Sequence, residues 1–126
     1  MDLSDVPLFA LADRRLAWVG ARQSVLAQNI ANADTPHYAA RDLKPFAAAL
    51  SQASVTLERT DPAHLAPPGG SQSFGAGPDV AELSPDGNSV ALDKELVKVA
   101  DTDAAHELVT TLTQTYMGFV RTAIGR

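Results

Sequence analysis

Three histidines, His37, His64 and His106, are the side chains best suited to metal binding, and they lie far apart in the sequence. The chain has no cysteine, and no histidine pair has the HxxxH or HExxH spacing that places two ligands on one helical face. Surface or loop positions therefore explain these histidines better than a metal site does. The sequence predicts no bound metal.

The remaining reactive side chains do not indicate catalysis either. Asp101, Asp103 and Glu107 form an acidic cluster, but on a helix the first two point to different faces, so a solvated patch is expected. No serine lies in a GxSxG motif, and no GK[ST] follows the glycines of the middle region, Gly69, Gly70, Gly75 and Gly77. We expect no enzyme, no catalytic or cofactor-binding residue, no cofactor and no small-molecule substrate.

Size and charge restrict the class of partner. The 126 residues suffice for one compact domain. Only 6% of them are aromatic and much of the apolar content is alanine, so a thin core is expected. Ten Lys and Arg against fifteen Asp and Glu give a net charge of -5, which is the wrong sign for binding nucleic acid. The absence of cysteine excludes disulfides.

No targeting or membrane segment is expected. Residues 1–11 lack the basic and apolar regions of a Sec signal peptide. No window approaches the ~18 consecutive apolar residues of a membrane span, because Asp13, Arg14, Arg15 and Arg22 interrupt the best candidate.

A long amphipathic helix is predicted near the N-terminus. Its apolar residues alternate at spacings of three and four, as in a heptad seam, and Leu11, Trp18 and Val25 widen that face. Pro36 predicts that the helix ends at Thr35. The seam consists of Phe9, Ala12, Leu16, Val19, Gln23, Leu26, Ile30 and Ala33.

The middle of the chain gives weaker signals. A short helix is expected over 46–50, with Asp42 as a candidate N-cap, and Val55, Leu57 and Arg59 alternate with polar residues as in one strand. Residues 61–89 contain five prolines and five glycines, which is typical of a loop, a linker or a segment that orders on a partner. The clearest turn signal in that segment is residues 84–88.

A second long helix is predicted at the C-terminal end, with Asp93 as its cap and about 31 residues of helical pattern. Ten residues separate Val99 from Val109 where a heptad gives seven or eleven, so the register is expected to slip over 101–106. Gly118 costs this helix ~1 kcal/mol unless a neighbouring backbone approaches it. Its apolar stripe comprises Leu92, Leu96, Val99, Val109, Leu112, Tyr116, Phe119 and Ala123.

These elements predict a mainly α fold. The two long helices pack as a hairpin or as an intermolecular coiled coil, and the middle is loop-rich, partly extended or disordered. We divide the chain into an N-terminal helical segment over 1–60, a Pro/Gly-rich linker over 61–89, and a C-terminal helical segment over 90–126 that forms one unit with the first. Because the two apolar faces exceed what one mutual contact buries, self-association is expected.

The end of the first helix carries the most specific motif. Residues 29–38 read Asn-Ile-Ala-Asn-Ala-Asp-Thr-Pro-His-Tyr. The simplest interpretation is a helix stop, since Asn tolerates a left-handed cap and Pro prevents continuation. Alternatively, Asn29 and Asn32, three residues apart on one face, bond the backbone of a neighbouring chain.

This motif closely resembles the N-terminal signature of the flagellar rod and hook family, approximately ANNxANxxTPGY. Agreement over residues 40–46, 60–65 and especially 84–95 narrows the resemblance to the proximal rod members of that family. Two residues depart from the family pattern. His37 stands where the family usually has glycine, so the turn after Pro36 is expected to differ or to avoid positive φ. Ala91 departs from the residues that the family usually has before the last helix.

The resemblance implies a structural subunit of the bacterial flagellar basal body, needed for motility and located in the periplasmic rod. It implies delivery by the flagellar type III export apparatus without a cleaved signal. The implied partners are other rod proteins, a FliE-type basal adaptor and the export gate, contacted through the terminal helices. Carried over to this chain, the assembly interface comprises Phe9, Leu16, Val19, Leu26, Asn29, Ile30, Asn32, Leu96, Val99, Val109, Leu112, Tyr116 and Phe119.

Two alternatives stay open at this point. One is a helical adaptor or export chaperone that remains in the cytoplasm and binds a client. The other is a small hydrolase that uses His64 or His106.

Overall fold

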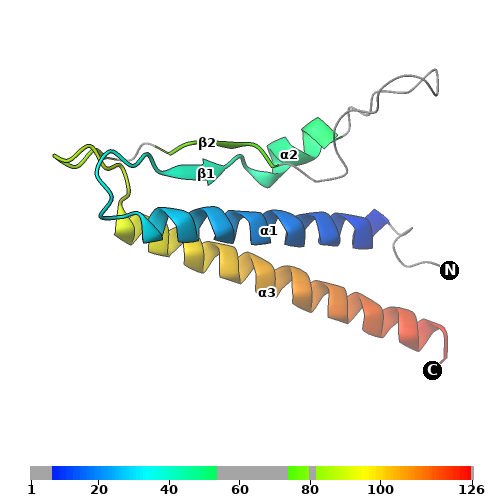
Figure 1. The fold of residues 1–126 in the computed structure, drawn as a ribbon. Coiled ribbons are helices and arrows are strands. Elements are labelled where there is room, and N and C mark those ends of the chain that lie inside the picture. Colours follow the sequence, from blue (N-terminus) through cyan, green and yellow to red (C-terminus); the bar gives the residue numbers. More distant parts are fainter. Residues whose placement is uncertain (1–6, 54–73, 80–81, 126) are drawn as a thin grey trace, which may run out of the picture.

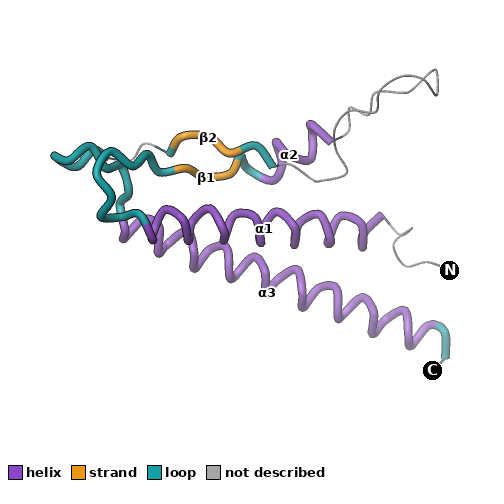
Figure 2. Tube along the Cα trace, in the orientation of Figure 1, coloured by secondary structure: helices purple, strands orange, loops and turns teal. Residues whose placement is uncertain are grey.

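The computed structural model describes residues 7–53, 74–79 and 82–125. In Figure 1 the long helix α1 lies between the β-strands and α2 on one side and the helix α3, which runs antiparallel to it, on the other. Figure 2 shows the same order by element type. The prediction of a mainly helical hairpin is confirmed. The elements in chain order are α1 (Pro7–Ala31), β1 (Arg41–Leu43), α2 (Phe46–Ala53), β2 (Ala76–Pro78) and α3 (Leu92–Ala123).

Helix α1 has 25 residues and ends at Ala31, so the predicted end at Thr35 is wrong. Beyond Ala31 the backbone tightens into bonds that span three residues, with the Ala33 N–H donating to Ile30 O and the Thr35 N–H to Asn32 O. Carbonyls of this turn are also bound by a side chain from a distant part of the chain. The predicted helical turn up to Thr35 is therefore replaced by a turn with a tertiary cap.

Two three-residue strands form an antiparallel pair above α1, in the register Arg41↔Pro78, Asp42↔Gly77 and Leu43↔Ala76. Strand β2 lies within the segment 61–89, so part of that segment is extended, which is one of the states expected for the middle of the chain. Asp42 lies in β1 and does not cap α2, because its carboxylate is bound by Arg22 from α1.

The strand expected over Val55, Leu57 and Arg59 lies outside the described residues. The proposed division of the chain at residues 60 and 90 likewise stays a prediction.

Helix α3 runs unbroken for 32 residues, close to the predicted length. Asp93 lies in its first turn instead of capping it, because the N-cap is Ala91, which makes no side-chain cap bond. The buried and half-buried positions that form its inner side recur at steps of three or four, so the register slip expected over 101–106 is absent there. This inner side comprises Glu95, Val99, Thr102, Ala105 and Val109. A pattern of large apolar residues alone does not identify this inner side, because it includes Glu95, Thr102 and Ala105.

The apolar core is small and centres on α1. Trp18, Val19 and Leu43 form its buried cluster, and Ala105 packs against them from α3. The Trp18 indole meets Phe46 of α2 edge-on, with 6.1 Å between ring centroids, a contact worth ~0.5–1.5 kcal/mol beyond its buried area. Its N–H donates to Lys44 O at 3.0 Å, so the only polar atom of the ring is satisfied. One aromatic anchor thus fixes the strands and α2 on α1.

Candidate assembly interface

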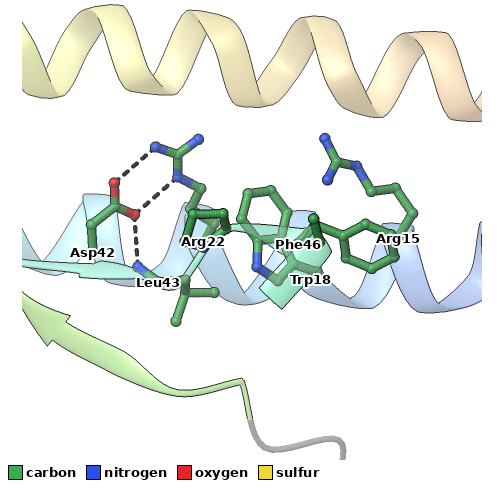
Figure 3. A pocket seen from close by; sticks show the side chains of 8 residues that line it. Arg15, Trp18, Arg22, Asp42, Leu43 and Phe46 are labelled. Atoms are coloured by element: carbon green, nitrogen blue, oxygen red, sulfur yellow. Dashed lines mark hydrogen bonds and ion pairs between the residues drawn. The ribbon is translucent and has the colours of Figure 1, made fainter. Parts of the chain in front are cut away.

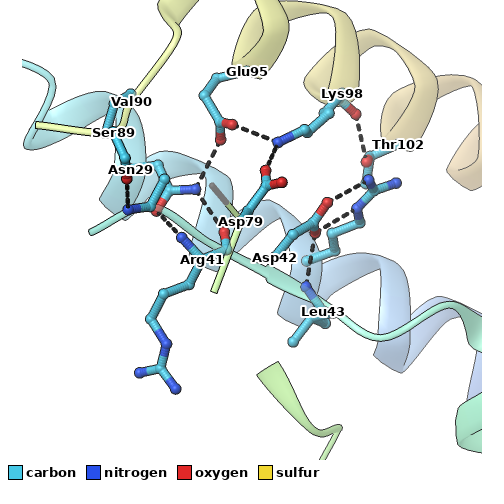
Figure 4. Close-up of polar contacts among 12 residues, drawn as sticks. Asn29, Arg41, Asp42, Leu43, Asp79, Ser89, Val90, Glu95, Lys98 and Thr102 are labelled. Carbon is cyan, nitrogen blue, oxygen red and sulfur yellow. Dashed lines mark hydrogen bonds and ion pairs between the residues drawn. The ribbon is translucent and has the colours of Figure 1, made fainter. Parts of the chain in front are cut away.

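Asn29 of α1 joins three elements at a fully buried position. Its side-chain amide donates to Arg41 O of β1 at 2.6 Å and to Glu95 Oε2 of α3 at 2.8 Å (Figure 4). Its carbonyl oxygen accepts from the Arg41 N–H at 3.1 Å and from the Tyr38 hydroxyl at 3.3 Å. All four bonds lie within one chain. A bond from Asn29 to a neighbouring chain would require this junction to open.

The Glu95 carboxylate is buried at the other side of that junction and is shared with a lysine. Lys98 Nζ donates to Glu95 Oε1 at 2.6 Å and also to Asp79, which follows β2 (Figure 4). Partial burial on its own would lower the pKa of Lys98, but the hydrogen bonds to Asp79 and Glu95 outweigh it and raise the pKa above the ordinary lysine value. Buried charge is thereby paired, and α3 is tied to both α1 and the strand layer.

Asn88 provides the cap that ends α1. Its side-chain nitrogen donates to the carbonyl oxygens of Asn32, Ala33 and Thr35 at 2.9, 2.8 and 2.7 Å. Its own carbonyl oxygen accepts from the Val90 N–H at 2.7 Å. Asn88 is only 2% exposed, so its side-chain amide has little access to water. A residue more than fifty positions away in the chain therefore determines where the first helix stops.

The turn that carries Asn88 is fitted to the turn after Pro36. His37 has φ 60°, so the expectation that this turn avoids positive φ is wrong. That the turn differs from the family's stays a prediction. The His37 N–H donates to Asp86 O at 3.1 Å, and the imidazole lies so close to Gly87 that a Cβ there would be 2.6 Å from Nδ1. With φ 79°, Gly87 is required both by conformation and by space.

A hollow of about 430 Å³ opens between α1 and the β1–α2 segment (Figure 3). Arg22 donates to both oxygens of Asp42, at 2.9 and 2.8 Å, and the Leu43 N–H adds a third bond to that carboxylate. Burial acts to raise the pKa of Asp42, but the Arg22 bonds outweigh it and hold this pKa below the usual range. The same carboxylate raises the pKa of Arg22. A carboxylate saturated in this way is not free to act as an acid or base.

The assembly residues expected from the sequence fall into three groups. Phe9, Val19, Leu26 and Asn29 are buried within the chain. Partial exposure is found for Leu16, Ile30, Asn32, Val99 and Val109. The exposed group consists of Leu96, Leu112, Tyr116 and Phe119. The seam of α1 is therefore turned mainly inward, and the exposed residues of this set all belong to α3.

The C-terminal half of α3 is the largest exposed apolar feature of the described residues. Residues 108–120 contain no Asp, Glu, Lys or Arg. Leu108 is 68% exposed and Phe119 is 65% exposed, and Leu112, Tyr116 and Met117 accompany them. Sequence reasoning missed Leu108 and Met117 because it followed a single seam. The thirteen-residue run without charge is the signal that points to them.

Comparison with known proteins gives a consistent answer. No protein-family model matches the chain. The flagellar basal body rod protein FlgB of Agrobacterium fabrum is 33% identical over 120 residues, which cover 90% of both chains. The FlgB protein of Escherichia coli K12 is 38% identical to this chain over 101 residues, which cover 69% of this chain and 70% of that protein. The FlgB protein of Cereibacter sphaeroides is 36% identical to this chain over 107 residues, which cover 82% of both chains. The chain belongs to the FlgB family of flagellar basal body rod proteins.

Membership in the FlgB family confirms the resemblance seen in the sequence, and the fold explains its two main motifs. The segment 29–42 and the segment 84–95 meet at one junction: Asn88 binds the carbonyls that end α1, and Glu95 binds Asn29. Ser89 reinforces the contact, since its hydroxyl oxygen accepts from the Ala40 N–H at 2.8 Å. Both motifs therefore build the closed end of the hairpin.

The described part of the chain shows no group of three or more His, Cys, Asp or Glu side chains that could hold a metal ion. His37 and His106 are exposed and far from each other in the sequence, and His64 lies outside the described residues. Among the described helices none is both long and apolar enough to cross a membrane.

Proposed function

We propose that this chain is a structural subunit of the proximal rod of the flagellar basal body. In this proposal it reaches the periplasmic rod through the flagellar type III export apparatus and assembles through its two long helices. Membership in the FlgB family supports the role of rod protein and the location in the basal body. A rod subunit is a structural protein and not an enzyme, so the hydrolase alternative is not supported.

The observation that carries the proposal is the uncharged, exposed side of α3. The hairpin leaves Leu108, Leu112, Tyr116 and Phe119 uncovered although each would gain from burial. Burying one such side chain fully is worth ~1.5–3 kcal/mol, and these are partly to largely exposed, so a partner that covers them gains several kcal/mol. A subunit made for assembly is expected to keep such a surface, whereas an isolated monomer gains nothing from it.

The partners follow from the same proposal. Other rod proteins cover the apolar side of α3, and further copies of the chain are expected among them. A FliE-type basal adaptor and the export gate are proposed as contacts at the rod base. The net charge of -5 and the absence of a basic patch in the sequence argue against nucleic acid.

The test is deletion of the gene in its host, with rods in purified basal bodies viewed by electron microscopy and swimming scored. Loss of rods and swimming, restored by the wild-type chain, supports the proposal. Restoration should fail with Phe119→Asp, because a charge would be buried without a partner. Glu107→Lys, which reverses an exposed charge just outside the uncharged run, should restore both. Intact rods in the deletion strain would refute the proposal and favour a cytoplasmic adaptor or export chaperone.

A further inference from the structure

The hollow between α1 and the β1–α2 segment contains one charge that the fold does not pair (Figure 3). Among its described lining residues the charged side chains are Arg15, Arg22 and Asp42. Arg22 and Asp42 form a bidentate ion pair, so their charges compensate each other. Arg15 takes part in no ion pair within the described part of the chain. The hollow therefore has an excess positive charge, although the whole chain has a net charge of -5.

Two aromatic rings hold Arg15 in place. Its guanidinium carbon Cζ lies 4.7 Å from the ring centroid of Trp18 and 4.8 Å from that of Phe46. A guanidinium held over aromatic rings still has five N–H donors for an acceptor. The side chain is half-buried, so a group from outside can reach these donors. Arg15 is thus a cation that is already oriented for a partner.

The two long helices supply no carboxylate for Arg15 within the described residues. On α1 no acidic residue stands three or four positions away, where a partner on the same side of the helix would lie. Helix α3 runs antiparallel to α1, and its Asp103 is bonded to Gln23. Arg15 lies about two turns before Gln23, so the part of α3 level with it lies about two turns beyond Asp103. That part falls in the run 108–120, which has no Asp or Glu.

We propose that this hollow receives an aspartate or glutamate side chain of a neighbouring rod subunit, which pairs with Arg15. This inference rests on the proposed role as a rod subunit and adds one specific contact to it. Charge complementarity supports the occupant, because a carboxylate matches both the excess positive charge and the two-pronged donor geometry of a guanidinium. The aromatic rings beside Arg15 keep water from part of the site, which strengthens such a pair.

Other kinds of partner fit the hollow less well. An uncharged side chain seated here would cover Arg15 without a counter-charge, and a basic one would add a like charge. The carboxylate of Asp42 is already bound by Arg22, so it does not compete for Arg15. The hollow has a volume of about 430 Å³ and is also lined by Pro45 and Ala47. An acidic side chain can therefore pack its CH₂ groups on apolar atoms while its carboxylate meets Arg15.

Photo-cross-linking identifies the occupant. Ala47 lines the hollow and is exposed, so p-benzoylphenylalanine at this position reaches a group that enters the hollow. The variant is expressed in the deletion strain, purified basal bodies are irradiated, and the joined peptides are identified by mass spectrometry. We expect a peptide of another subunit with an aspartate or glutamate at or beside the point of attachment. A product within the same chain, or a neighbouring peptide without a carboxylate, would overturn the inference.

Charge reversal tests the pair itself. Arg15→Glu should lower the number of rods per cell at least about tenfold, because two like charges would then meet in the hollow. Arg41→Glu is the matched control, since Arg41 is exposed and its guanidinium points away from the polar junction (Figure 4). This control should form rods in the wild-type number. Rods in the wild-type number with Arg15→Glu would overturn the inference and leave the proposed rod function intact.

A compensating change in the neighbour separates this contact from misfolding. Replacing the cross-linked aspartate or glutamate with arginine should restore rods in the Arg15→Glu strain, because opposite charges meet again. The same replacement should lower the number of rods when Arg15 is intact. A folding defect of Arg15→Glu would not be cured by a change at the neighbour's site, so a persisting loss of rods would overturn the inference. Failure of the wild-type chain to restore rods would instead refute the proposed function.

Discussion

Replacing Asn88 with alanine tests whether a distant side chain really determines the end of α1. The substitution removes a donor that lies 2.7 to 2.9 Å from three carbonyl oxygens, together with the acceptor for the Val90 N–H. The amide has two hydrogens, so it can satisfy two of the carbonyls well and the third only in part. With water largely excluded from the site, each group left unsatisfied costs ~1–3 kcal/mol.

The expected loss for Asn88→Ala is therefore ~2–4 kcal/mol. That is a large part of the ~5–15 kcal/mol by which a domain is usually stable. The measurement is urea unfolding followed by helical circular dichroism. Since the slope for a small protein is ~1–3 kcal/mol per molar urea, the midpoint should fall by at least about 0.7 M. The slope itself should stay unchanged if the native and unfolded states keep their exposed areas.

Two further variants make the reasoning refutable. Asn88→Asp keeps the shape and the acceptor but sets a carboxylate against the carbonyls, so it should destabilise at least as much as alanine does. Asn32→Ala is the matched control, because Asn32 is half-buried and its side chain bonds the nearby Gln28 O and Thr35 hydroxyl. If Asn88→Ala lowered the midpoint no more than Asn32→Ala, the tertiary cap would contribute nothing special.

Three other predictions concern the turn and the ion pair beside this junction. Gly87→Ala should lower the free energy of unfolding by ~1–2 kcal/mol, because of the positive φ and the contact with His37. A double-mutant cycle should give a smaller loss in a His37→Gly background. His37→Gly alone should raise the urea unfolding midpoint. It relieves ~1–2 kcal/mol of left-handed strain, which exceeds the ~0.5–1 kcal/mol lost through the greater entropy of the unfolded chain. An unchanged or lower midpoint would contradict this. Asp42→Asn should reduce stability at pH 7 and flatten its acid dependence. The pKa of Asp42 is lower in the folded state, so its contribution is complete above the unfolded pKa of ~3.9 and disappears as the pH falls through the folded value. Equal losses on acidification in Asp42→Asn and wild type would show that this carboxylate does not act through its Arg22 pair.

Much of this protein is determined by local sequence. Apolar residues spaced three and four apart predict the two long helices, because residues at that spacing lie on one face of a helix that has 3.6 residues per turn. Residue types also explain why the sequence predicts no disulfide and no metal site, since the chain has no cysteine and no histidine pair at metal-ligand spacing. The motif residues 29–38 and 84–95 are specific enough to indicate the family, which the FlgB relatives then confirmed.

Other features depended on contacts between segments far apart in the chain. Helix α1 ends at Ala31 and not at Thr35, and Asn88 binds the carbonyls of the turn that follows, a contact that no local signal at residue 31 records. Asp42 looked like a helix cap from its neighbours, but Arg22 lies within reach only after folding. The strands β1 and β2 are three residues each, too short for a periodic pattern.

The orientation of α3 shows the same limit most clearly. The sequence left open whether the large apolar residues of α3 cover α1 of the same chain or another molecule; in the structure Glu95 and Thr102 are the buried positions, while Leu112 and Phe119 face outward. Hydrophobic periodicity locates a face but does not say whether the chain's own helix or another molecule covers it. That choice was made by Asn29, Lys98 and Asp79, which satisfy the buried Glu95 side of α3 and so turn its apolar side to the outside.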